Sequence, residues 1–193
     1  AIAQFRAEAC NVAVELFATH DTVSLRQLAG AMGYSPAAMY RYFKDSEELF
    51  MATRQACFEQ FAAHLRHTMS TEAHPRARVV LLCNTYAQYA HDHPNAYRLM
   101  FQLGQPNPTR FPWAKTIGFD AWSALEEMVA YAVEHRALSG PVDEIAHVFW
   151  AAIHGVVSLS LARRLRMGLD CQPLLTATID ALCRAYQPEQ EEP

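Results

Sequence analysis

Positively charged side chains gather in one short stretch of this 193-residue chain. Between Thr22 and Lys44 the sequence has three cations, Arg26, Arg41 and Lys44, and no acidic residue, whereas the whole chain has a formal net charge of −4. A local positive surface attracts phosphate groups, although three cations in such a stretch can also occur by chance. The pattern therefore indicates a small phosphate-facing surface on an acidic protein.

The other side chains that could do chemistry are histidines and cysteines. The closest pairs among the nine histidines, His64/His67 and His91/His93, have a spacing more typical of surface residues than of metal ligands. The scattered cysteines, with no CxxC pair, predict reduced, buried thiols, with a redox sensor as the alternative: Cys10, Cys57, Cys83, Cys171 and Cys183. Without a Ser-His-Asp order or a phosphate-binding glycine loop, we expect no enzyme activity, metal or cofactor.

The stretch that carries the three cations is predicted to begin with a short helix. Ser24 is a suitable N-cap, and Gln27 three residues later completes a capping box. Gly33 can adopt the left-handed conformation that a tight helix C-terminus needs. These signals predict a helix from about residue 25 that ends in a tight turn.

A second helix is predicted directly after this turn. Ser35 can cap it, and Pro36 at its first position needs no N–H. Met39 and Phe43 form its buried stripe. Two capped helices joined by a glycine turn are typical of a DNA-binding helix-turn-helix, and a helical hairpin without DNA binding is the alternative.

The rest of the chain shows helical periodicity and no strand-like alternation. We therefore expect an all-α protein with about nine helices. One of them, from Asp45 to about Met69, begins with a predicted capping box of Asp45 and Glu48 and links two domains. We expect two domains, at 1–45 with the helix-turn-helix and at 46–187, and a disordered tail at 188–193. The Pro-rich stretch 104–112 is expected to be a loop or hinge. No apolar run reaches about 18 residues without a charge or histidine, so no membrane span is expected.

Small residues recur along the next-to-last predicted helix. A stripe of this kind permits close helix packing, and the last helix offers an apolar seam. Two such helices from each of two chains could form a four-helix bundle, with packing inside one chain as the alternative. The predicted dimerisation residues are Ala151, Gly155, Ser158, Ala162, Leu175, Ile179 and Leu182.

The chain resembles the tetracycline-repressor (TetR) family of transcriptional regulators. The resemblance is strongest over Ala9–Phe50, and Trp150, His154 and Gly155 are similar to the Trp-His-Gly signature of one family branch. It implies a dimer with an N-terminal DNA-binding domain at 1–45 and a C-terminal effector-binding and dimerisation domain at 46–187. Ser46 departs from the Lys that the family usually has at this position. Carried over by position, the DNA-facing residues would be Ser24, Arg26, Ser35, Pro36, Ala37, Tyr40, Tyr42 and Lys44, with Arg41 either a base reader or a partner of Asp45.

Aromatic and soft side chains are frequent in the predicted effector domain. As a set they suggest an apolar cavity with few polar anchors, suited to a hydrophobic or aromatic effector, although each residue alone could simply fill the core. The predicted ligand-binding residues are Tyr86, Tyr89, Phe101, Phe119, Trp122, Met128, Trp150 and His154, with His154 as the polar anchor.

These observations lead to one hypothesis and one alternative. The chain is expected to be a cytoplasmic, dimeric transcriptional regulator, a repressor that binds double-stranded operator DNA and is released by a small apolar effector. The alternative is a helical small-molecule-binding protein whose DNA binding is weak or lost.

Overall fold

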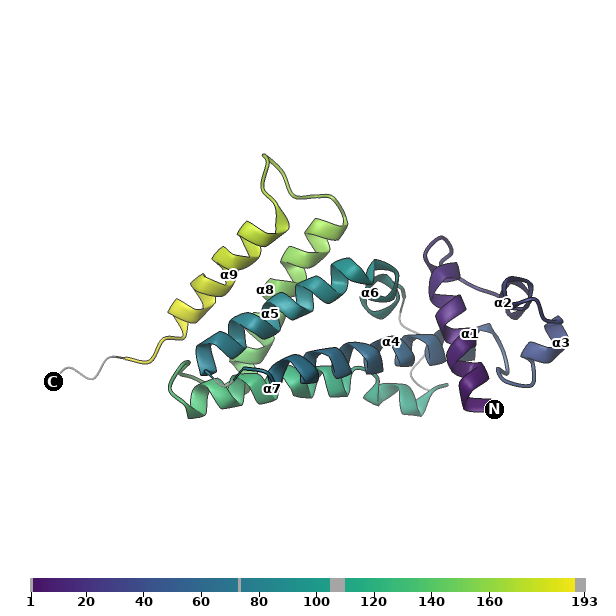
Figure 1. The fold of residues 1–193 in the computed structure, drawn as a ribbon, viewed down its shortest axis with the longest axis horizontal. Coiled ribbons are helices and arrows are strands. Elements are labelled where there is room, and N and C mark those ends of the chain that lie inside the picture. Colours follow the sequence, from purple (N-terminus) through teal and green to yellow (C-terminus); the bar gives the residue numbers. More distant parts are fainter. Residues whose placement is uncertain (1, 73, 105–109, 190–193) are drawn as a thin grey trace. The chain divides into compact units, whose positions relative to one another are not determined.

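A computed structural model describes residues 2–72, 74–104 and 110–189 of the chain. These residues form nine α-helices and one 3-10 helix and contain no strand, which confirms the all-α prediction (Figure 1). The elements are α1 (Ile2–Phe17), α2 (Leu25–Met32), α3 (Pro36–Met39), α4 (Ser46–Met69), α5 (Pro75–Asp92), α6 (Pro94–Phe101), η1 (Pro112–Thr116), α7 (Phe119–Glu134), α8 (Val142–Leu161) and α9 (Cys171–Ala185).

The chain divides into two compact units. Unit 1 comprises residues 1–60 and 93–119, and unit 2 comprises residues 61–92 and 120–193. The helix α4, 24 residues long, contributes residues to both units. The units are defined by packing, so the functional boundary after residue 45 stays a prediction. Residues 105–109 of the expected hinge and 190–193 of the expected tail lie outside the described residues.

Unit 1 is built around the buried faces of its N-terminal helices. Phe17, Leu28, Met39 and Phe43 are almost fully buried, so α1, α2 and α3 share one apolar core. The helix α6 packs against α1, and Arg98 on α6 strengthens this contact. Its guanidinium donates to the Phe17 carbonyl and pairs with Asp21 at 2.5 Å.

Unit 2 is a helical bundle in which α8 and α9 lie side by side and α5 packs against both (Figure 1). The apolar faces of these helices are buried, with Phe149 and Ile153 on α8 and Leu175 and Ile179 on α9. Burial of apolar area of this kind is the main source of stability in a helical bundle.

Four of the five cysteines are buried and all five are unpaired, as the sequence predicted for the buried thiols. Burial raises the pKa of the Cys57 thiol to about 12 and raises that of Cys83 as well. A thiol with a raised pKa has little reactive thiolate at neutral pH. These buried cysteines therefore act as small core residues.

One helix within the described residues, α8, is long and apolar enough by composition to cross a membrane. No span was expected from the sequence, because Asp143, Glu144 and two histidines interrupt this segment. Core helices of globular proteins meet the same criteria, and Ile145, Phe149 and Ile153 of α8 are buried in unit 2. The length and composition of α8 are therefore only weak evidence for a membrane span.

Candidate nucleic-acid interface

The predicted signals at both ends of α2 are present. The Ser24 hydroxyl accepts from the Gln27 amide at 3.2 Å, and the Gln27 side chain accepts from the Ser24 amide at 2.9 Å, so the capping box is complete. Gly33 has a φ of 73° and ends the helix. A Cβ at Gly33 would meet no atom within 4 Å, so this position needs glycine for its backbone conformation.

The second helix of the motif is shorter than the sequence suggested. Ser35 caps α3 by accepting from the Ala38 amide at 3.3 Å, and Pro36 is its first residue. However, α3 ends at Met39, and the chain continues to Phe43 in turns. The Tyr42 and Phe43 amides both donate to the Met39 carbonyl, which tightens this segment and lets Met39 and Phe43 both reach the core.

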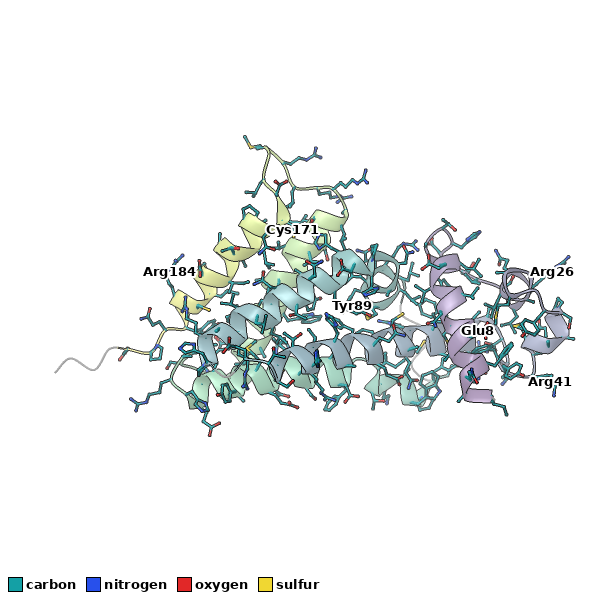
Figure 2. All side chains as sticks on the ribbon, in the orientation of Figure 1. Glu8, Arg26, Arg41, Tyr89, Cys171 and Arg184 are labelled. Atoms are coloured by element: carbon teal, nitrogen blue, oxygen red, sulfur yellow. The ribbon has the colours of Figure 1, made fainter. Side chains whose placement is uncertain are left out.

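Most of the predicted DNA-facing side chains are exposed to solvent. Figure 2 shows Arg26 on α2 and Arg41 after α3 at the outer edge of the helix-turn-helix. Tyr40 is 64% exposed. The other exposed members of the set are Ser35, Pro36, Ala37 and Lys44, and Ser24 is half-buried.

Tyr42 is placed differently from Tyr40. Its ring stacks on Phe5 of α1 with a centroid distance of 4.0 Å, and its carbonyl accepts from the Arg6 guanidinium. The Tyr42 ring thus packs within unit 1, and its half-buried side chain is less accessible than Tyr40.

Acidic residues crowd the start of α4, immediately after Lys44. The Asp45 carboxylate caps the helix by accepting from the amides of Glu47 and Glu48 at 3.0 and 2.9 Å. The Glu48 carboxylate reaches back to the Lys44 amide at 2.8 Å. The predicted cap at Asp45 is confirmed, and the Glu48 side chain bonds one residue earlier than in a standard capping box.

Two arginines that sequence reasoning missed pair with these acids. Arg6 of α1 pairs with Glu48 at 3.2 Å and packs over the Phe43 ring at 4.5 Å. Arg110, which precedes η1, pairs with both Asp45 and Glu47. The structure therefore gives Asp45 a partner in Arg110. No local pattern could have revealed these pairs, because 42 or more residues separate the partners.

A groove of about 540 Å³ lies beside this charged cluster. It is lined by cations, acids and aromatic rings of unit 1: Arg6, Lys44, Asp45, Glu48, Ala52, Gln55, Arg110, Phe111 and Trp113.

In unit 2 the structure brings four of the predicted ligand-binding residues together. The Tyr86 hydroxyl and His154 Nδ1 are 3.0 Å apart, and His154 Nε2 lies 3.3 Å from the Ser158 hydroxyl. The Trp150 ring is 5.9 Å from the His154 ring and 6.1 Å from Trp122. Burial lowers the pKa of His154, which favours its neutral form.

The other predicted ligand-binding residues have different surroundings. Tyr89 packs on the Phe61 ring, which also contacts Tyr86, and Met128 is fully buried. Phe101 and Phe119 belong to unit 1, where Phe101 contacts Phe58 and Phe119 is 63% exposed. Within the described residues, no group of three or more His, Cys, Asp or Glu side chains is placed to hold a metal ion.

The predicted dimerisation residues divide by exposure. Leu175 and Ile179 are buried inside unit 2, where α9 packs on α8. Ala151 and Ala162 are exposed, while Gly155, Ser158 and Leu182 are half-buried.

Comparisons with known proteins found family matches for both the N-terminal and the C-terminal part of the sequence. Residues 79–182 match the family described as "Tetracyclin repressor-like, C-terminal domain", and residues 10–53 match "Bacterial regulatory proteins, tetR family". A search of curated proteins found no match.

Several solved structures have the same fold. A Rhodococcus sp. RHA1 protein of unknown function is 27% identical, with a TM-score of 0.76 and 86% of each chain covered. The protein SCO4313 is 28% identical, with a TM-score of 0.75 and coverage of 94% of this chain and 96% of that one. The TetR family regulator PfmR from Thermus thermophilus is 18% identical, with a TM-score of 0.68 and coverage of 94% and 99%. With a capped helix-turn-helix in unit 1 and family matches that together span residues 10–53 and 79–182, this chain belongs to the TetR family of DNA-binding transcriptional regulators.

Proposed function

We propose that this regulator is a cytoplasmic homodimeric repressor that leaves its DNA operator when a small hydrophobic or aromatic effector binds. The observation that carries the DNA-binding part is the exposed edge of the helix-turn-helix. There Arg26, Arg41 and Lys44 extend into solvent while Met39 and Phe43 hold the edge in place from the core. Residues 1–45 would form the DNA-binding domain and residues 46–187 the effector-binding and dimerisation domain.

Phosphate contacts supply most of the expected binding energy at this edge. Cations and tyrosine hydroxyls can contact DNA phosphates, whereas a small apolar side chain such as that of Ala37 can make only apolar contacts with base edges. Tyr40 is the tyrosine best placed for this role because its side chain is exposed and that of Tyr42 packs on Phe5. Affinity should therefore depend strongly on salt.

The dimer is proposed to form through α8 and α9. Leu175 and Ile179 support it indirectly, as core residues that hold the two helices together. Small residues lie along α8 and at its C-cap, namely Ala151, Gly155 and Ala162, and α9 exposes small residues at four-residue spacing, namely Pro173, Ala177 and Ala181. Small residues let helices of two chains approach closely.

The effector is proposed to bind near the aromatic cluster of unit 2. Tyr86, Trp122, Trp150 and His154 combine a large apolar surface with one neutral imidazole. This composition suits an apolar or aromatic molecule with a single polar group. We also propose that the domain is of the Trp-His-Gly type, based on Trp150, His154 and Gly155. Because α4 contributes residues to both units, it is the segment through which binding would alter DNA affinity.

The DNA-binding part is tested by fluorescence anisotropy with labelled duplexes. DNA from upstream of the protein's own gene is compared with an unrelated duplex of equal length at several salt concentrations. A repressor should prefer the upstream duplex and lose affinity steeply as salt rises. A second candidate, an effector-binding protein with weak or lost DNA binding, is favoured by the acids Asp45, Glu47 and Glu48 beside Lys44. It predicts no preference and no measurable binding at physiological salt.

The effector part is tested with the intrinsic tryptophans. A panel of aliphatic and aromatic compounds is titrated while fluorescence and operator binding are followed together. An effector should change both over the same concentration range, because binding and release are linked. Trp122→Phe and Trp150→Phe should alter the response, whereas Trp113→Phe in unit 1 is the matched control. Unchanged responses in both unit 2 variants would place the pocket elsewhere.

A further inference from the structure

The start of α4 presents a problem for a DNA-binding surface. Lys44 is exposed and belongs to the proposed phosphate-facing set, yet Asp45, Glu47 and Glu48 follow within four residues. Carboxylates this close to a DNA phosphate repel it, and the repulsion is strong at low ionic strength. If these acids were left unpaired, they would cancel the attraction that Lys44 provides.

The acids are not left unpaired. Glu48 pairs with Arg6 at 3.2 Å, and this arginine is also held by the Phe43 ring and the Tyr42 carbonyl. Asp45 and Glu47 share a single partner, Arg110, whose two terminal nitrogens each donate to one of the carboxylates. Three acids and two arginines, together with Lys44, leave the start of α4 with a net charge of zero.

Arg110 comes from a part of unit 1 far from the helix-turn-helix in sequence. It precedes η1 and lies 65 residues after Asp45. Its guanidinium lies 5.4 Å from the Phe111 ring centroid, which helps to orient the side chain. The Arg110 side chain is 46% exposed and lines the same groove as Arg6 and Lys44.

We propose that Arg110 is a positioning residue for DNA binding, which neutralises Asp45 and Glu47 and so allows a phosphate to approach Lys44. The inference rests on the proposed DNA-binding function. Arg110 acts through the two carboxylates. DNA binding requires its positive charge more than the shape of its side chain. The DNA-binding surface of unit 1 is therefore completed by a residue outside the helix-turn-helix.

The test compares DNA binding of four full-length variants with the wild type by fluorescence anisotropy. Arg110→Gln removes the charge, and Arg110→Lys keeps it. Arg66→Gln is the matched control, because Arg66 is an ion-paired arginine of unit 2 with the same 46% side-chain exposure. The double variant Glu47→Gln/Arg110→Gln removes one of the acids that Arg110 neutralises. Thermal unfolding of each variant verifies that it is folded.

Arg110→Gln should weaken binding about tenfold at low salt, for operator and unrelated DNA alike. The difference from wild type should shrink as salt rises, because added ions screen the exposed carboxylates. Arg110→Lys should bind within about twofold of wild type, as should Arg66→Gln. The double variant should recover most of the lost affinity.

Several results would overturn the inference. If Arg110→Lys fails as badly as Arg110→Gln, or if the defect persists at high salt, Arg110 serves as a structural clamp. An equal loss in Arg66→Gln would show a general charge effect. Wild-type affinity in Arg110→Gln would remove Arg110 from DNA binding while leaving the proposed function intact. A wild type that binds no DNA at any salt concentration would sink both proposals.

Discussion

The helix-turn-helix of unit 1 and the aromatic cluster of unit 2 differ in how far apart in sequence their interacting residues lie. In the helix-turn-helix, the Ser24 and Ser35 caps each join residues three positions apart. In unit 2, Tyr86 and His154 meet across 68 residues of sequence. The first region presents charge to solvent, whereas the second gathers aromatic rings, including the partly exposed Trp150, beside an imidazole whose pKa is lowered by burial.

This difference links the type of interaction to the type of partner. A surface that contacts phosphates needs only exposed cations held in place by a rigid core, because electrostatic attraction acts over a distance and does not require burial of the partner. A site for an apolar molecule must remove area from water and therefore needs side chains from several helices. Substitutions in the two regions should consequently fail in different assays.

The largest expected effect is a loss of stability when a core residue beneath the charged surface is removed. Phe43→Ala removes a fully buried ring that also carries Arg6, so it should lower the free energy of unfolding by about 3–5 kcal/mol. Urea denaturation followed by circular dichroism measures this loss. Tyr40→Ala, exposed on the same segment, is the control and should change stability by less than about 0.5 kcal/mol. Equal stability of the two variants would contradict the burial of Phe43.

A large effect on assembly, with little effect on the fold, is expected at Gly155. A Cβ at this position meets no atom within 4 Å in the chain, so Gly155→Leu should leave each chain folded. If α8 lies in the dimer interface, the added side chain should separate the two chains. Sedimentation velocity measures the oligomeric state.

The control for this variant is Gly30→Leu on α2, where a Cβ also meets no atom within 4 Å. It should leave the dimer intact. A wild-type sedimentation coefficient for Gly155→Leu would place the interface on another surface. A DNA half-site needs one recognition helix per chain, so dissociation should also weaken operator binding.

A smaller effect is expected from single exposed DNA-facing side chains. Lys44→Ala should weaken binding to all sequences and reduce the slope of log K against log salt by about 0.9. Tyr40→Ala should weaken binding with little change in slope, because it removes a neutral donor. Anisotropy titrations at a series of salt concentrations separate the two. Unchanged affinity in both variants would remove this edge from the DNA interface.

The smallest effect concerns pH and lies in unit 2. Burial lowers the pKa of His154 below its ordinary value of 6.5, so the unfolded chain binds this proton more readily than the folded chain. Its contribution to stability is therefore complete above about pH 6.5 and decreases as the pH falls. The difference in melting temperature between wild type and His154→Gln should shrink from pH 7.5 to 5.5. A difference that is constant with pH would show that His154 does not titrate in this range.

Much of unit 1 could be predicted from short sequence patterns. The caps at Ser24, Ser35 and Asp45 and the left-handed Gly33 all depend on residues within four positions of one another. Such interactions form in any context that allows the helix, which is why they were confirmed. The end of α3 was predicted four residues too late, because Phe43 reaches the core from a turn as well as it would from a helix.

The aromatic cluster of unit 2 depends more on three-dimensional packing than the helix caps of unit 1 do. Aromatic residues are frequent enough in the predicted effector domain to suggest a cavity. Tyr86, Trp122, Trp150 and His154 form one cluster, and Tyr89 is joined to it through the Phe61 ring. Phe101 and Phe119 fall in the other compact unit. Composition indicates that aromatic rings are present, whereas helix packing decides which of them meet.

By itself, the sequence determined the helical class, the position of the helix-turn-helix and the caps that delimit it, because backbone capping and helical periodicity act over a few residues. Only the tertiary structure decided which charges are neutralised. Arg6 and Arg110 reach the acids at the start of α4 from 42 and 65 residues away, and Leu175 and Ile179 turn toward the interior of their own chain. Ion pairs and buried contacts between distant segments depend on how helices pack, and that arrangement leaves no local pattern in the sequence.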